Sequence, residues 1–272
     1  MSSVCFSSDG RLLATAGTGA PARVWEVDSG GEVTEIGSER DAPWSVAFAS
    51  DSRTVVVTGR SVGPSCVFDL AAGIDLLRLP GGGYCVTPDG RVACIEGASI
   101  ALHELKRPVL DGDQAALWED LMGKDARRAY RAVWSLGAAK DGATFLRDRV
   151  LGACEAKEDA AVRALVEDLD AERVETRTKA FKSLSSYGEE ILPFLRKIRD
   201  AALSAEARAR VDMLLDQCAA SKSPRLLARL RAIQALELAG ATEVLRELSE
   251  RVPTQVERRR IRRALERLVK HR

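Results

Sequence analysis

The chain has 272 residues, of which 41 are Lys or Arg and 40 are Asp or Glu, so its formal net charge is +1. With 46% hydrophobic and 30% charged residues, it can bury a sizeable core, which excludes general disorder. Residues 1–110 carry 9 basic and 13 acidic residues, net −4, whereas residues 111–272 carry the other 32 and 27, net +5. Glycine is divided in the same way, since 14 of 21 lie in the first 110 residues. This pattern predicts a turn-rich β half followed by an α half.

Three segments of the first half align with one another. Each carries an aspartate at the same place, and these aspartates are 42 and 38 residues apart: Asp9, Asp51 and Asp89. An apolar run follows each aspartate, and one more strand closes each unit, at residues 23–27, 66–70 and 100–105. Ser-Asp-Gly and Pro-Asp-Gly are tight-turn sequences. The pattern therefore predicts small antiparallel sheets that must stack to bury both faces.

These units resemble the WD40 repeat, which runs V-x-F-S-P-D-G, L-A-S-G-S, V-x-V-W-D and T-G. Residues 4–30 match best, residues 46–73 are recognisable, and residues 84–105 are degenerate. The resemblance implies a partial β-propeller of about three blades over residues 1–107 and a protein-binding surface. By the same analogy, Trp25 and Phe68 should pack between blades. The Gly-His pair that usually opens a repeat is missing, since Ser38-Glu39 stands in its place.

The number of blades is too small for a ring, because propellers close with ~4–8 blades. In addition, residue 1 falls where the first strand of a blade is already running. Three explanations are open: the chain is a fragment, its start codon lies downstream of the true one, or another chain completes the ring. We favour the first two.

From Asp111 onward the apolar residues recur with a helical period of about 3.6. We expect connecting helices over residues 108–157 and α-helical repeats over residues 158–272. Residues 161–218 and 223–248 resemble two copies of a HEAT-like repeat, which implies a small α-solenoid. The fold class expected is thus multi-domain β + α. The order of the parts resembles the C-terminal end of long bacterial WD40 proteins, which implies a scaffold without an assigned reaction.

Enzymatic chemistry finds little support in the sequence. Of the two histidines, His103 lies in an expected strand and His271 is the penultimate residue. Gly81 to Gly83 are expected to connect strands, and Asp168 and Asp170 to end a helix. The six cysteines lack metal-like spacing. We predict a non-enzyme with no cofactor and no metal site. No apolar run is long enough to span a membrane and no signal peptide is recognisable, which favours a reducing, cytoplasmic location.

The basic excess of the second half is concentrated in the last expected helix. Residues 254–272 carry eight basic and two acidic residues, net +6. A possible patch for an anionic partner comprises Arg258, Arg259, Arg262, Arg263 and Lys270. The simpler interpretation is a solvated helix that caps the repeats, and we favour it because no aromatic residue stands among the arginines.

Two functions therefore remain open. The first is a non-catalytic scaffold that binds other proteins through its blades and helical repeats. The alternative is binding of nucleic acid or another anionic surface through the Arg-rich terminal helix, which we consider less favoured.

Overall fold

The computed structural model describes residues 3–17, 19–37, 43–59, 65–79, 84–87, 91–96, 99–154, 158–199, 204–220 and 223–270. The chain divides into two compact units, residues 1–135 and 136–272. The first unit contains antiparallel β-sheets followed by helices, and the second is helical. The expected β + α class is confirmed. The observed division falls inside helix α2 (Ala126–Ala138). The domain bounds expected from the sequence therefore stay a prediction, at residues 1–107, 108–157 and 158–272.

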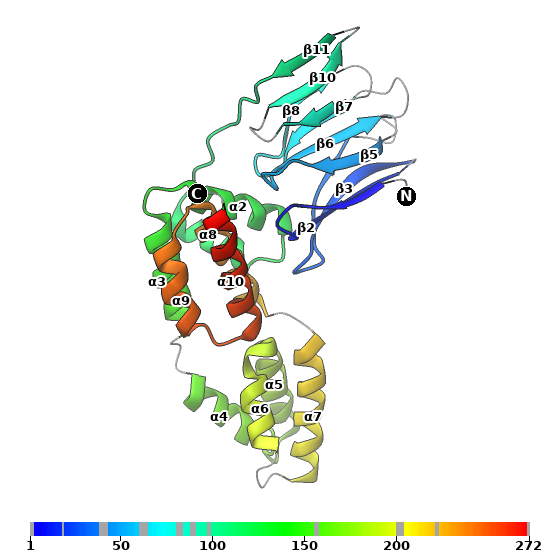
Figure 1. Ribbon diagram of the computed structural model, residues 1–272. Helices are drawn as coiled ribbons and strands as arrows, with labels where there is room; N and C mark the ends of the chain where they lie inside the picture. Colours follow the sequence, from blue (N-terminus) through cyan, green and yellow to red (C-terminus); the bar gives the residue numbers. More distant parts are fainter. Residues whose placement is uncertain are drawn as a thin grey trace. The chain divides into compact units, whose positions relative to one another are not determined.

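The first unit contains three antiparallel sheets that lie face to face in chain order (Figure 1). The first sheet consists of β1 (Ser3–Phe6), β2 (Leu12–Gly17), β3 (Ala20–Glu26) and β4 (Glu32–Ile36). The second consists of β5 (Pro43–Phe48), β6 (Thr54–Gly59), β7 (Ser65–Asp69) and β8 (Ile74–Leu79). The third consists of β9 (Tyr84–Val86), β10 (Val92–Glu96) and β11 (Ser99–His103). Each repeated unit of the sequence thus forms one sheet.

The first two sheets contain a strand that the sequence pattern did not predict. After β3 and β7 the chain turns at Gly30 and Gly73, whose φ angles of 70° and 71° favour glycine, and returns as β4 and β8. In β4 the adjacent residues Val33 and Thr34 are both buried, which breaks the alternation of a half-buried strand. The prediction that the third strand closes each unit was therefore wrong for the first two sheets.

The third sheet differs from the other two in the number of residues between its first two strands. Phe6 pairs with Leu13 and Phe48 pairs with Val55, so residues 7–12 and 49–54 form the turns. In the third sheet Val86 pairs with Val92, so one residue fewer separates these two paired residues in the sequence. Because one residue reverses the face on which a side chain lies, Val92 takes the place of Leu13 and Val55.

Two apolar layers join the three sheets. The layer between the first and second sheets contains Ala14 and Val24 from one side and Val55 and Phe68 from the other. The layer between the second and third sheets contains Val56, Val67 and Val92. The predicted stacking of the repeated sheets is thus present at both contacts.

The helices that follow are α1 (Gln114–Met122) and α2 in chain order, and then those of the second unit. One group comprises α3 (Gly142–Cys154), α8 (Pro224–Leu238), α9 (Thr242–Arg251) and α10 (Gln255–Lys270), with α3 in contact with α8 and α9. Another group has its own core and comprises α4 (Glu158–Asp168), α5 (Val174–Ser185), the short 3-10 helix η2 (Gly188–Ile191), α6 (Leu192–Arg199) and α7 (Ala205–Ala220).

This packing does not follow the chain order that we expected for repeats over residues 158–272. Helix α3, expected to be a connector, packs against α8 and α9, which lie some seventy residues or more further along the chain. The HEAT-like solenoid stays a prediction. Within the described part of the chain, no helix combines the length and apolar character needed to cross a membrane.

Candidate interaction surfaces

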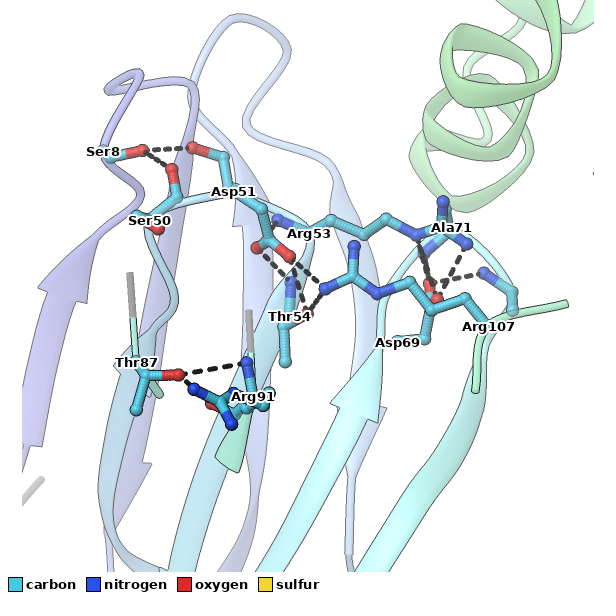
Figure 2. Close-up of polar contacts among 12 residues, drawn as sticks. Ser8, Ser50, Asp51, Arg53, Thr54, Asp69, Ala71, Thr87, Arg91 and Arg107 are labelled. Carbon is cyan, nitrogen blue, oxygen red and sulfur yellow. Dashed lines mark hydrogen bonds and ion pairs between the residues drawn. The ribbon is translucent and has the colours of Figure 1, made fainter. Parts of the chain in front are cut away.

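A polar network lies at the turns between the first two strands of the sheets (Figure 2). The Asp51 carboxylate accepts hydrogen bonds from the backbone N–H groups of Arg53 and Thr54, at 2.9 and 2.8 Å, and from the Thr54 hydroxyl at 2.8 Å. Arg107, which follows the third sheet, donates to the same carboxylate at 2.5 Å and to the Thr54 hydroxyl at 2.9 Å. The network therefore ties the segment after the third sheet to the turn of the second.

Arg53 connects this network to helix α2. Its guanidinium forms an ion pair with the fully buried Asp69 at 2.7 Å and lies 4.9 Å from the ring centre of Trp134. Tyr130, on the same helix, donates from its hydroxyl to the Ser52 carbonyl at 2.7 Å. Tyr130 is itself part of the layer between the first two sheets. Helix α2 thus covers the turn end of these sheets, so this end is committed to the internal packing of the first unit.

Two ionisable groups of this network have shifted pKa values. Burial tends to raise the pKa of Asp51, but the hydrogen bonds from Thr54 and Arg53 and the charge of Arg107 outweigh it and lower the pKa. Burial raises the pKa of Tyr130 well above its ordinary value of 10. The network therefore favours a charged Asp51 and a neutral Tyr130.

The first sheet has one face that no other described segment covers. Cross-strand pairing places Val4 beside Thr15, Phe6 beside Leu13, and Leu13 beside Trp25 on this side of the sheet. Val4 is 52% exposed and Phe6 is 62% exposed. We call this surface the outer face; it comprises Val4, Phe6, Leu13, Thr15, Arg23 and Trp25.

The equivalent positions of the second sheet are buried. Val46 and Phe68, which correspond to Val4 and Trp25 in the repeat, are 3% and 7% exposed because the first sheet lies over them. The expectation that Phe68 packs between sheets is confirmed. The same expectation was wrong for Trp25 within the described chain, because Trp25 lies on the outer face, half-buried, and its indole N–H donates to the Thr15 hydroxyl at 3.4 Å.

The outer face is hollowed and has a charged margin. An open hollow of about 450 Å³ is lined by Thr15, Ala16, Gly17, Ala20, Pro21, Arg23 and Trp25. Arg23 forms an ion pair with Glu35 at 2.7 Å and lies 3.8 Å from Glu32. An aromatic and apolar centre with a polar margin is the usual composition of a protein-binding surface.

The basic residues singled out from the sequence lie on α10, and all five are exposed: Arg258, Arg259, Arg262, Arg263 and Lys270. We call these residues the basic face. At 100° per residue, Arg259, Arg262, Arg263 and Lys270 share one side of the helix with Glu266. In the described chain, no ion pair involves these four basic residues, whereas the Arg258 guanidinium donates to the Val252 carbonyl at 3.2 Å.

Two ion pairs hold α10 against α8. Near the start of α10, Glu257 forms an ion pair with Arg229 at 2.5 Å, and both side chains are almost fully buried. Near its end, Arg267 donates to both carboxylate oxygens of Glu237, at 2.5 and 2.9 Å. These contacts determine which side of α10 faces solvent. The sequence did not predict them, because both partners of each pair lie far apart in the chain.

The residues considered for catalysis are dispersed or have structural partners. His103 is half-buried in β11, and Asp170 accepts a 2.5 Å hydrogen bond from the Ser204 hydroxyl at the start of α7. Asp168 ends α4. Gly81 to Gly83, the Ser38-Glu39 pair and His271 lie outside the described residues. The described side chains include no group of His, Cys, Asp and Glu that could hold a metal ion.

Comparisons with known proteins add a distant structural similarity. No protein-family profile matches the chain. No curated protein matches it in sequence. Among solved structures, it is similar to the WD40 domain of SCAP from fission yeast, with 14% identity and a TM-score of 0.27, over 39% of this chain and 32% of that one. The match thus spans about a third of the length of that chain.

Proposed function

We propose that the protein is a non-catalytic scaffold that binds another protein through the outer face of its first sheet. The observation that carries this proposal is the exposure of Val4 and Phe6, whose equivalents in the second sheet pack against a neighbouring sheet. An exposed apolar sheet face favours burial against a partner, since removing apolar surface from water stabilises by about 25 cal/mol per Å².

The proposal includes the finer assignment of the fold. The spacing of Asp9 and Asp51, the four-stranded sheets and their face-to-face stacking support WD40-like propeller blades. Contacts between consecutive helices of the second unit, such as α4 with α5 and α8 with α9, support the proposal of HEAT-like repeats, in a packing order that departs from a simple stack. Such architectures present extended surfaces to proteins rather than enclosed reaction sites.

Site-specific photo-cross-linking tests the proposed surface. A benzophenone amino acid replaces Phe6 in the whole chain, and a matched chain carries it at Val109, which is 90% exposed but lies outside the sheets. Each of the two chains is irradiated in an extract of the cells that make the protein, to which purified chain is also added. The benzophenone at residue 6 should cross-link to a protein, and the benzophenone at residue 109 should not. Equal capture at both positions, or none at residue 6, would contradict the proposed role of the outer face.

A second candidate function is binding of nucleic acid through the basic face. It is supported by the exposure of Arg259, Arg262 and Arg263 and by the absence of ion pairs to them within the described chain. Phosphate binding by cations releases counterions, so the affinity falls with salt by about 0.9 log units per log unit of salt for each phosphate contacted. Three such contacts would contribute a slope of about −2.7.

Replacement of these three arginines by glutamine should reduce the salt slope for duplex DNA by about 2.7 if each contacts a phosphate. The matched control replaces Arg128, Arg208 and Arg246, which are exposed on three other helices, and therefore makes the same change in net charge. Equal slopes for the wild type and the α10 variant would rule out the basic face as a DNA-binding surface.

A further inference from the structure

The third sheet also has a face that no described segment covers, at the other end of the stack. Register places Ala93 beside Leu102 on the side of the sheet away from Val92, which packs against the second sheet. Leu102 is 52% exposed and Ile100, two residues before it on the same side of β11, is 75% exposed. The stack of three sheets therefore ends in an exposed apolar face on both sides.

These two exposed faces are of different types. We call the two faces of each sheet its leading face and its trailing face. In the first, second and third sheets, the leading face carries the cross-strand pairs Ala14–Val24, Val56–Val67 and Ala93–Leu102, respectively. The trailing face carries, in the same order, the pairs Leu13–Trp25, Val55–Phe68 and Val92–His103. At the first internal contact, the leading face of the first sheet meets the trailing face of the second. At the next contact, the leading face of the second sheet meets the trailing face of the third. Every internal contact therefore joins one leading face to one trailing face.

The described segments thus leave one face of each type uncovered: the trailing face of the first sheet, which is the outer face, and the leading face of the third. The same contact that occurs twice inside the chain can form between these two faces if they belong to different molecules. We propose that the protein that covers the outer face is a second copy of this chain. In this arrangement, each protomer places its third sheet on the first sheet of the other.

Such a pair closes on itself. Because each protomer contributes both faces, a two-fold axis relates two identical contacts, and no exposed end of either type remains to continue a fibre. The pair contains six sheets, which lies within the ~4–8 that form a closed propeller. A second copy thus provides the ring completion by another chain that the sequence left open as one of three explanations. This inference depends on the proposed function, since it names the partner of the same outer face.

The size of the two contacts is adequate for a stable dimer. Strands lie ~4.8 Å apart and rise ~3.3 Å per residue, so a face of three to four strands and five residues measures roughly 300 Å². Two contacts give about 600 Å² of sheet face per protomer, near the ~800 Å² of accessible surface that each partner buries in a standard interface.

Complementation between two variants of the whole chain tests the arrangement. Phe6→Glu introduces a charge on the outer face, and Leu102→Arg introduces one on the leading face of the third sheet. Each variant alone damages both contacts of its own dimer, and self-association should weaken by at least ~100-fold. In an equimolar mixture, one contact of the mixed dimer is entirely native and the other brings opposite charges to the two faces, so dimers should reappear.

The readout is the molar mass from light scattering after size-exclusion chromatography, with circular dichroism as a check of folding. Val109→Arg, a charge at an exposed apolar residue outside the sheets, is the control and should leave the dimer intact. A monomeric wild type, a dimer unaffected by either variant, or a mixture that stays monomeric would each overturn the inference. If the chain is monomeric but residue 6 still cross-links to a different protein, the proposed scaffold function stands and the second copy is excluded as its partner.

Discussion

The buried ion pair between α8 and α10 provides a sharp test of how the second unit presents its basic face. Arg229 is 1% exposed and Glu257 is fully buried, and their side chains meet at 2.5 Å. Glu257 also accepts hydrogen bonds from the Thr254 amide at 3.1 Å and from the Thr254 hydroxyl at 2.7 Å, which completes the N-terminal capping box of α10. The carboxylate therefore has two roles, as a charge partner of α8 and as a helix cap.

Glu257→Gln separates the two roles. Glutamine can still serve in a capping box, so the cap is kept, but the buried guanidinium of Arg229 loses the negative charge of Glu257. Removing one partner of a buried pair costs about 3–5 kcal/mol, a large fraction of the ~5–15 kcal/mol that stabilises a typical domain. The double variant Arg229→Met/Glu257→Gln removes both charges, and we expect it to recover at least ~2 kcal/mol relative to Glu257→Gln.

The coupling free energy is measured by chemical denaturation, with α-helical circular dichroism as the signal. The four proteins compared are the wild type, Glu257→Gln, Arg229→Met and the double variant. The matched surface control is Arg246→Met, which removes an exposed pair with Glu243 and should cost no more than about 1 kcal/mol. Additive effects of the two buried substitutions, or a cost below about 1 kcal/mol for Glu257→Gln, would refute the assigned role of this pair in fixing α10.

Three further predictions concern local contacts. Tyr130→Phe, which removes the hydrogen bond to the Ser52 carbonyl, should cost about 1–2 kcal/mol of unfolding free energy in urea. Because the pKa of Asp51 is lowered in the folded state, its carboxylate contributes to the free energy of unfolding above the ordinary value of 3.8. This contribution is lost as the pH falls through the folded-state pKa. Asp51→Asn should therefore flatten the decline of stability below pH 3.8, as followed by tryptophan fluorescence. Gly240→Ala, at a φ of 66° after α8, should lower the unfolding free energy by about 1 kcal/mol, and an unchanged melting temperature would contradict this.

The sequence predicted the features that depend on short-range chemistry. The aspartates at residues 9 and 51 fix tight turns by local hydrogen bonds, so their spacing revealed the repeat. Ser223 likewise accepts a hydrogen bond from the Leu226 amide at the start of α8, where Pro224 is the first helical residue. Such signals lie within a few residues of one another and are readable without knowledge of the tertiary structure.

The features that the sequence did not predict depend on residues far apart in the chain. The role of Arg53 is one example, because its partners Asp69 and Trp134 are brought together only by the stacking of the sheets and the position of α2. The packing of α3 against α8 and α9 is another, since the helical period shows which side of a helix is apolar but not which helix covers it. The outer face was missed for a related reason: Trp25 has the pattern of a buried strand residue, and only the structure shows that no described segment lies over it.

The molar mass of the purified wild-type chain over a wide concentration range is the most direct measurement of the central claim, that the outer face binds a protein and that this protein is a second copy. We predict a closed dimer, with a mass twice that of the chain that reaches a plateau as the concentration rises. A chain that stays monomeric throughout that range would contradict the claim, as would a mass that increases without a plateau.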